Sequence, residues 1–272
     1  MRRFVDLHIH TCFSDGTATP QEVLDMARSS NVAAIAITDH DTVEGYLAVR
    51  QIITEDDPEL IAGVEFSVTM ENADMHILAY LFDPECTPLK ASLHKFQQHR
   101  SERGRKMVDK LVKLGVDITY ADVQKVAGDA VIGRPHVGRA MFEKGALRYY
   151  EEAFDKYIGY DGPAYVPKSN FTSQQAIDLI HEANGLAVLA HPAIDEKDRY
   201  LPMLLEMGLD GIEVYHPSHS RSDIDRFKHL ADRHRLLMTG GSDFHGMSGR
   251  YDRVGSLKVP YECLESLKAK KK

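Results

Sequence analysis

The chain alternates between short apolar segments and amphipathic segments with helical spacing, and this alternation restricts its fold most strongly. The strand-like segments are residues 4–10, 33–38, 60–68, 75–82, 186–190, 211–215 and 236–239. Apolar strands that alternate with helices predict a mainly parallel sheet covered by helices. The number of strands fits either a barrel or an open doubly wound sheet, and periodicity does not choose between them.

Capping signals mark where two of the helices begin. Thr19 is followed by Pro20 and, three positions after the threonine, by Glu22, which is the pattern of a capping box. Thr172 begins another helix, for which Gly185 is the stop signal. Further helices are expected over residues 43–54, 201–207 and 222–234.

The middle of the chain has a different character. It is charged, helical and poor in strand signals, with one long amphipathic helix expected over residues 93–114. Shorter helices are expected over residues 120–127, 137–144 and 151–158. The simplest interpretation is a helical subdomain of residues 89–170 inserted into a domain made of residues 1–88 and 171–272.

Composition and charge limit the cellular setting and the partners. The 272 residues carry a net charge of −8 with neutral histidine, so the surface as a whole attracts neither long duplex DNA nor an anionic membrane. Three cysteines without paired spacing fit a reducing cytoplasm, and no apolar run has membrane-spanning length. We expect a cytoplasmic protein, and no protein partner is predicted. The lysines between Lys268 and Lys272 are expected to form a frayed basic tail.

Histidines and carboxylates lie on or just after nearly every strand-like segment. Residues two apart on a strand share a face, so the imidazoles of His8 and His10 can point at one ion. In α/β folds functional groups gather at the carboxyl ends of strands, and most of these residues lie there. Nine ligand-type residues follow this pattern, and they are His8, His10, Asp15, His40, Glu65, His76, His191, Asp243 and His245.

This donor set points to a metal centre with more than one ion. Six histidines and three carboxylates exceed the needs of a single metal, so two or three divalent ions are expected, and Glu65 could bridge a pair. Nitrogen and oxygen donors without thiolate suit Mn²⁺, Fe²⁺ or Zn²⁺ better than Ca²⁺, and Mn²⁺ is our first choice. Cys12 lies between His10 and Asp15, and we interpret it as a packing residue.

The same residues stand in motifs that resemble the polymerase and histidinol phosphatase (PHP) family. The motifs are His8-Ile9-His10, Asp15-Gly16, Thr38-Asp39-His40-Asp41-Thr42, Gly63-Val64-Glu65, His76, Ala190-His191-Pro192 and Gly241-Ser242-Asp243-Phe244-His245. The resemblance covers the chain outside the insert and implies a distorted seven-stranded (β/α) barrel that holds up to three ions. It implies one ion on His8, His10, Glu65 and Asp243, a second on Glu65, His76 and His191, and a third on Asp15, His40 and His245.

Two motifs in the insert extend the resemblance to one branch of the family. Residues 133–139, before a predicted helix, and residues 162–168 resemble the inserted domain of nucleotide 3′,5′-bisphosphate phosphatases and of a 5′-to-3′ exoribonuclease that trims 5′-monophosphorylated RNA. Arg134 offers a bidentate fork for phosphate, Lys168 a point charge and His136 a further donor. We therefore expect these three residues to bind the substrate.

The residues and the resemblance together predict a metal-dependent phosphoesterase. The expected substrates are phosphate esters of nucleotides, either a 3′,5′-bisphosphate nucleotide or a short 5′-phosphorylated RNA. A hydroxide held by the ions is the expected nucleophile for in-line attack on phosphorus. His216, at the end of another strand, is a candidate for assisting the leaving group, and an orienting role is an equally good interpretation.

Three alternatives stay open. The first is a cyclic phosphodiesterase or a small-molecule phosphatase of the same fold. The second is a metal-dependent amidohydrolase, whose barrel also opens with His-x-His and closes with Asp, but His40, Glu65 and His245 argue against it. The third is a non-catalytic module that binds nucleic acid or a protein, which the complete ligand set disfavours because degenerate members of the family lose ligands.

Overall fold

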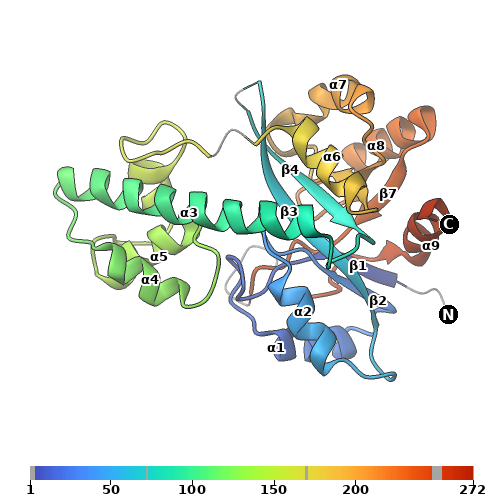
Figure 1. Ribbon diagram of the computed structural model, residues 1–272, viewed down its shortest axis with the longest axis horizontal. Helices are drawn as coiled ribbons and strands as arrows, with labels where there is room; N and C mark the ends of the chain where they lie inside the picture. Colours follow the sequence, from blue (N-terminus) through green and yellow to red (C-terminus); the bar gives the residue numbers. More distant parts are fainter. Residues whose placement is uncertain (1–3, 72, 169–170, 247–252, 272) are drawn as a thin grey trace. The chain divides into compact units, whose positions relative to one another are not determined.

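The computed structural model describes residues 4–71, 73–168, 171–246 and 253–271 (Figure 1). The chain divides into two units, one of Met1–Ser92 and Asn170–Lys272 and the other of Leu93–Ser169. Helix α3 (Thr87–Lys113) begins in the first unit and continues into the second. None of the helices within these described ranges is both long enough and apolar enough to cross a membrane.

The first unit is built on an eight-stranded sheet that curls into a nearly closed barrel. In sheet order its strands are β7 (Leu237–Gly240), β6 (Gly211–Tyr215), β5 (Leu186–Leu189), β4 (Ala73–Tyr80), β3 (Glu59–Met70), β2 (Ala34–Ile37), β1 (Phe4–Ile9) and β8 (Val259–Pro260). The segment after β7 closes the barrel against β1, because Ile9 pairs with Phe244 and the Asp243 amide donates to the His8 carbonyl at 2.9 Å. The barrel prediction is confirmed, and the two-residue β8 is an addition to the seven expected strands.

Strand β4 runs antiparallel to both of its neighbours, β3 and β5. The pairs β1–β2, β2–β3, β5–β6 and β6–β7 are parallel, as the alternation of strands and helices predicted. The reversal at the β3–β4 hairpin brings the first half of β4 to the end of the barrel where the parallel strands finish. His76 lies in that half, so it faces the same end as Glu65 although it is not at a carboxyl end.

Within the described residues six further helices complete this unit. They are α1 (Pro20–Ser29), α2 (Glu44–Ile52), α6 (Ser173–Glu182), α7 (Leu201–Glu206), α8 (Arg221–His234) and α9 (Tyr261–Lys271). Two of them, α1 and α6, begin at the predicted capping signals. The Thr19 hydroxyl accepts from the Glu22 amide, and the Glu22 carboxylate accepts in return from the Thr19 amide. Thr172 and Gln175 form the same reciprocal pair at the start of α6. A 3₁₀ segment, η2 (Ile194–Tyr200), precedes α7 and had no sequence prediction.

The C-terminal lysines do not form a frayed tail up to Lys271, because Tyr261–Lys271 is helix α9. Its residues Leu264 and Leu267 are fully buried in the barrel core. Lys268 pairs through its ammonium with the Glu59 carboxylate at 2.6 Å, which ties the helix to the beginning of β3. Lys272 lies outside the described residues.

The second unit is helical and has a hydrophobic core of its own. After α3 it contains α4 (Tyr120–Ala127), α5 (Arg134–Glu143) and a π-helical turn, η1 (Phe154–Ile158). Its core side chains include Met107, Leu111, Val123, Val137, Met141 and Ile158. Helix α5 begins three residues before the predicted start at 137, because Gly133 serves as its N-cap and Pro135 fits its first turn.

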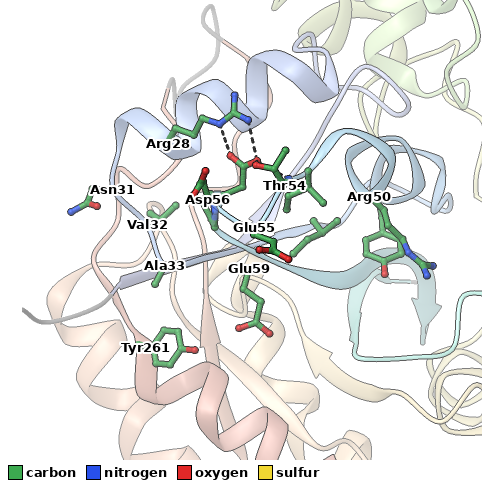
Figure 2. A pocket seen from close by; sticks show the side chains of 15 residues that line it. Arg28, Asn31, Val32, Ala33, Arg50, Thr54, Glu55, Asp56, Glu59 and Tyr261 are labelled. Carbon is green, nitrogen blue, oxygen red and sulfur yellow. Dashed lines mark hydrogen bonds and ion pairs between the residues drawn. The ribbon is translucent and has the colours of Figure 1, made fainter.

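A hollow of about 1240 Å³ opens at the amino ends of β2 and β3 (Figure 2). One wall is formed by a group of hydrogen bonds and ion pairs around Asp57. Its carboxylate accepts from Arg28 Nε, from Arg28 Nη2 at 3.0 Å, and from the amide and the hydroxyl of Thr54, each at 2.8 Å. These contacts join the end of α1 to the loop after α2, so we interpret the hollow as a structural feature. It lies at the opposite end of β2 from His40.

Replacing Asp57 with asparagine is expected to lower the melting temperature by about 2–5 °C, because charge-assisted hydrogen bonds to Arg28 and Thr54 are lost. Arg28 first, and then the Thr54 donors, hold the pKa of Asp57 well below its ordinary value of 3.8. A lowered pKa means that the carboxylate stabilises the fold above that ordinary value and loses its contribution as pH falls further. Thermal melts should therefore separate the two proteins at pH 7 and bring them together in acid. A constant difference down to pH 3 would contradict this explanation.

Candidate metal centre

The structure brings all nine predicted ligand residues together at one end of the barrel. They come from β1, from the loops after β1 and β2, from β3 and β4, and from the segments after β5 and β7. Their side chains form three overlapping groups around a central carboxylate, Glu65.

The first group contains His8, His10, Glu65 and Asp243. The two histidine Nε2 atoms lie 3.1 Å apart, and each is 3.3 Å from Asp243 Oδ1. Glu65 Oε2 is 3.2 Å from His10 Nε2 and 3.4 Å from His8 Nε2. Ligand atoms bound to one ion at about 2.0–2.2 Å lie roughly 2.8–3.6 Å from one another. The spacing of this group is therefore that of the corners of one coordination polyhedron.

The second group contains Glu65, His76 and His191. Glu65 Oε1, the other carboxylate oxygen, is 2.8 Å from His76 Nδ1 and 3.1 Å from His191 Nε2. The two ring nitrogens are 3.2 Å apart. Because Glu65 turns a different oxygen to each of the two groups, its carboxylate is arranged as a bridge between them.

The third group contains Asp15, His40 and His245, and it is looser. Asp15 lies 3.4 Å from His245 Nε2 and 3.8 Å from His40 Nε2. His10 approaches the same group through Nδ1, 3.9 Å from Asp15, and His40 approaches Glu65 through Nδ1 at 3.2 Å. His10 and His40 therefore each lie between two groups. The family resemblance had implied that each of them binds a single ion.

Electrostatics at this end of the barrel favour positive charge. Glu65 is 1% exposed, and although burial raises its pKa, the charges of His40, His76 and His8 outweigh burial and lower it well below 4.5. Burial works against a charged His10, yet Asp243 and Glu65 raise its pKa to about 10. A buried set of carboxylates is costly without compensating cations. Among the described residues, the surrounding imidazoles can supply such compensation by taking up protons, and the buried ammonium of Lys197 also interacts with Glu65.

The donor set fits divalent ions. The Glu65 carboxylate cannot accept a hydrogen bond from all five of the imidazoles around it. Two pairs of ring nitrogens, His8 with His10 and His76 with His191, also face each other at 3.1–3.2 Å. Among the described residues, the buried atoms without a hydrogen-bond partner include His10 Nδ1 and Asp15 Oδ1 of the same cluster. Cations shared among these atoms would satisfy all of them, so the residues are suited to hold two or three metal ions.

Three buried carboxylates beneath the cluster hold its loops, and sequence reasoning gave none of them a role. Asp39 accepts from the Thr11 amide at 2.7 Å and from the Ser14 hydroxyl at 2.6 Å, which fixes the loop between His10 and Asp15. Asp6 accepts from the Ser242 amide at 2.8 Å and from the Gly255 amide at 2.7 Å, next to Asp243. Glu213, on β6, accepts from His8 and from the His191 amide. Asp39 stood inside the recognised motif of residues 38–42, and Glu213 lay on the strand before the candidate His216, which were the available signals.

Two of the nine residues have left-handed backbones. The φ angle is 29° at His191 and 51° at Asp243. Such conformations cost about 1–3 kcal/mol for residues other than glycine and persist only where the surroundings impose them. His191 lies two residues after β5 and Asp243 three residues after β7, and the Glu213 and Asp6 carboxylates bind the backbone at these turns.

His216 contacts the cluster through Asp243. Its Nε2 lies 3.1 Å from Asp243 Oδ2, the carboxylate oxygen turned away from the first group. Its Nδ1 accepts from the Ser218 amide at 3.1 Å, so Nε2 carries the proton of the neutral ring and donates to Asp243. The ring is 1% exposed. These contacts orient the Asp243 carboxylate, and a role for His216 in protonating the leaving group stays a prediction.

In the second unit, Arg134 and His136 lie in the first turn of α5. His136 is buried and its Nδ1 accepts from the Gly133 amide at 3.0 Å, which caps the helix. The Arg134 guanidinium lies over the rings of Tyr160 and Tyr165, at 4.7 and 5.7 Å from their centroids. Stacking holds the plane of an arginine while its N–H edge stays available for an anion. Lys168 is half-buried, three residues beyond Tyr165.

Comparison with known proteins places this arrangement in a family. Residues 6–166 match the model of the PHP domain. A 3′,5′-nucleoside bisphosphate phosphatase from Chromobacterium violaceum is 34% identical over 90% of this chain and 89% of its own length. The 5′-3′ exoribonuclease Rnm of Salmonella typhimurium is 33% identical over 88% and 84%. A phosphoribosyl 1,2-cyclic phosphate 1,2-diphosphodiesterase from Eggerthella lenta is 31% identical over 94% and 98%.

Two solved structures are similar over nearly the whole chain. A Bifidobacterium adolescentis protein assigned as a metal-dependent phosphoesterase has a TM-score of 0.89 and 29% identity, covering 98% of this chain and 96% of that one. An amidohydrolase from Chromobacterium violaceum, with bound sulfate and no metal, has a TM-score of 0.86 and 31% identity, covering 97% and 96%. Since the PHP model matches more than half of the sequence and the relatives match most of its length, the chain belongs to the PHP domain family.

Proposed function

We propose that this PHP-family protein hydrolyses phosphate esters of nucleotides with the help of two or three divalent ions, Mn²⁺ being our first choice. The protein is a phosphoric ester hydrolase, in line with relatives named phosphatase, exoribonuclease and phosphodiesterase. The observation that carries the metal dependence is the bridging geometry of Glu65, whose two oxygens face two different groups of imidazoles. A cytoplasmic location stays a prediction from the sequence.

The proposed substrates are a nucleoside 3′,5′-bisphosphate and a short 5′-phosphorylated RNA. Relatives that are 34% and 33% identical over most of this chain are named for a nucleoside bisphosphate and for 5′-3′ exoribonuclease activity. We also propose that residues 89–170 form the substrate-binding subdomain, in which Arg134, His136 and Lys168 bind a phosphate. Support comes from the stacked guanidinium at the first turn of α5, where helix amides and an arginine favour an anion.

The nine cluster residues are proposed as the metal ligands, in the three groups described. Divalent ions bound there would polarise a phosphoryl oxygen and lower the pKa of a coordinated water. In the hydrolysis the oxygen of water forms the new bond to phosphorus, the ester P–O bond breaks, and the alcohol leaves with a proton. His216 orients Asp243 through the bond to Oδ2 and is the protein's candidate for supplying that proton.

A cyclic phosphodiester is the second candidate substrate. The Eggerthella lenta relative is named for a 1,2-cyclic phosphate and is 31% identical over 98% of its own length, which is as complete a match as the phosphatase offers. One solved structure is named an amidohydrolase, which favours an amide as the substrate. That structure, however, holds sulfate, which is an analogue of phosphate.

The deciding experiment measures phosphate release from adenosine 3′,5′-bisphosphate with Mn²⁺, for the wild-type protein and for a His8→Ala, Asp243→Ala double variant purified in the same way. We expect release by the wild type and a loss of at least about 1000-fold in the variant, because the first group loses two of its four residues. Metal content is measured in both proteins, so that activity can be compared with occupancy.

Parallel reactions with a short 5′-phosphorylated RNA, with a 1,2-cyclic phosphate of a phosphoribosyl compound and with an amide distinguish the alternatives. Turnover of the cyclic ester alone would move the assignment to the second candidate. Hydrolysis of the amide without any phosphate release would support the amidohydrolase interpretation. A metal-loaded wild type that hydrolyses none of them would contradict the proposed function and favour a binding module.

A further inference from the structure

Glu213 is a fully buried carboxylate that contacts two of the proposed ligand residues, His8 and His191. It contacts them at atoms other than the ring nitrogens that face the other proposed ligands. Its Oε1 lies 3.0 Å from His8 Nδ1, and its Oε2 accepts from the His191 backbone amide at 2.8 Å. It is 0% exposed, as is His8. A buried carboxylate with one oxygen on each of two donors has no spare oxygen turned to solvent, so its position depends on both partners.

The contact with His8 selects which ring nitrogen can bind a cation. A carboxylate is only an acceptor, so His8 Nδ1 must carry a proton and donate it to Glu213. In a neutral imidazole the lone pair is then on Nε2, which is the atom that faces His10, Glu65 and Asp243. Glu213 therefore sets the tautomer that the first group needs and also raises the basicity of the ligating nitrogen.

The contact with His191 acts on the backbone. His191 has a φ of 29°, which is unfavourable for a residue with a side chain. The bond from its amide to Glu213 holds this turn, and the turn directs His191 Nε2 toward Glu65 Oε1 at 3.1 Å. One carboxylate thus fixes a side chain of the first group and the main chain of a residue in the second.

We propose that Glu213 is a positioning residue that couples the first and second metal groups, by fixing the tautomer of His8 and the left-handed turn at His191. The proposal rests on the proposed metal centre. It predicts that a change at Glu213 weakens the binding of ions in both groups, although the side chain is not itself a ligand.

The test uses Glu213→Gln, which keeps the size of the side chain. An amide has one acceptor oxygen and one donor nitrogen, so it cannot accept from both the His8 Nδ1–H and the His191 amide, and its NH₂ group would favour the tautomer of His8 with the proton on Nε2. We expect about 10- to 100-fold weaker Mn²⁺ binding by titration and an altered visible spectrum of the Co²⁺-loaded protein. Glu213→Asp keeps the charge on a shorter stem, and it should recover part of the affinity through whichever of the two contacts it can still reach.

A matched control is Tyr80→Phe. Tyr80 is also fully buried in the barrel and donates its hydroxyl hydrogen to the Leu7 carbonyl at 2.7 Å, on the strand that carries His8. Burial first, and then the nearby charges of Glu213 and Glu65, raise the pKa of Tyr80, and the phenylalanine variant leaves both carboxylates in place. It should lower thermal stability by a few degrees and leave Mn²⁺ affinity within about twofold of the wild type. A purely structural role for Glu213 would make its glutamine variant behave like this control.

The outcomes separate this inference from the proposed function. Unchanged Mn²⁺ affinity and an unchanged Co²⁺ spectrum in Glu213→Gln, with a wild type that binds both ions, would overturn the positioning role. A wild type that binds the ions but hydrolyses no phosphate ester would contradict the proposed function alone, and the Glu213 comparison would still decide the inference. A wild type that binds neither ion would overturn both.

Discussion

Replacing Glu65 with glutamine is expected to lower phosphate release by about 1000-fold or more, the largest effect on activity of any single change considered for this protein. The carboxylate gives one oxygen to His76 and His191 and the other to His8, His10 and His40, at 2.8–3.4 Å. Several kcal/mol of transition-state stabilisation by bridged ions correspond to a factor of this size. Glutamine has no charge and only one acceptor oxygen, so it cannot bridge two groups.

The same variant should lose the thermal stabilisation that added Mn²⁺ gives the wild type, since ligands that bind only the folded state raise its stability. Melting temperatures with Mn²⁺ and with a chelator provide this second measurement, independent of turnover. Glu59→Gln is the matched control, because Glu59 lies on the same strand at its exposed beginning and pairs with Lys268. We expect the control to stay within about twofold of wild-type activity. Near-normal turnover in Glu65→Gln would disprove the bridging role.

Replacing Gly241 with alanine is expected to give the largest loss of stability. A methyl group at this position would lie 2.3 Å from the backbone nitrogen of His8 and 2.7 Å from its Cα. Real Cβ atoms do not approach backbone so closely, so β1 and the segment after β7 would have to separate. Overpacking of this kind costs about 3 kcal/mol or more, which corresponds to a fall of roughly 6–12 °C in melting temperature.

The separation of β1 from the segment after β7 would also displace His8 from Asp243, which lie on the two sides of the closure. Mn²⁺ affinity should therefore fall together with stability, as measured by titration and thermal melts on the same preparation. Gly145→Ala is the control, because its methyl group meets no atom within 4 Å and only the left-handed backbone, with a φ of 74°, is strained. That strain costs about 1–2 kcal/mol. A Gly241→Ala protein no less stable than the control would show that the closure is not tight at this point.

The prediction of helices and strands succeeded where local chemistry decides the structure. The capping box at Thr19 and the cap at Thr172 gave the correct starts of α1 and α6, because a side chain satisfies an amide three residues away whatever surrounds it. The start of α5 was predicted three residues late. The lysines from Lys268 onward were taken for a frayed tail because they looked solvated, although they belong to helix α9 as far as Lys271. The burial of Leu264 and Leu267 in this helix depends on β1 and β8.

The sequence by itself determined which side chains could make a metal centre. Imidazole and carboxylate residues at strand ends, two apart in His8–His10 and again in Asp243–His245, are evidence that needs only the period of a strand. Only the tertiary structure decided how these residues share their atoms. The antiparallel turn of β4 that places His76 beside Glu65, the two directions of the Glu65 carboxylate, and the contacts of Glu213 all join residues far apart in sequence. Such contacts depend on how the barrel closes, and barrel closure is set by packing between strands that no local pattern encodes.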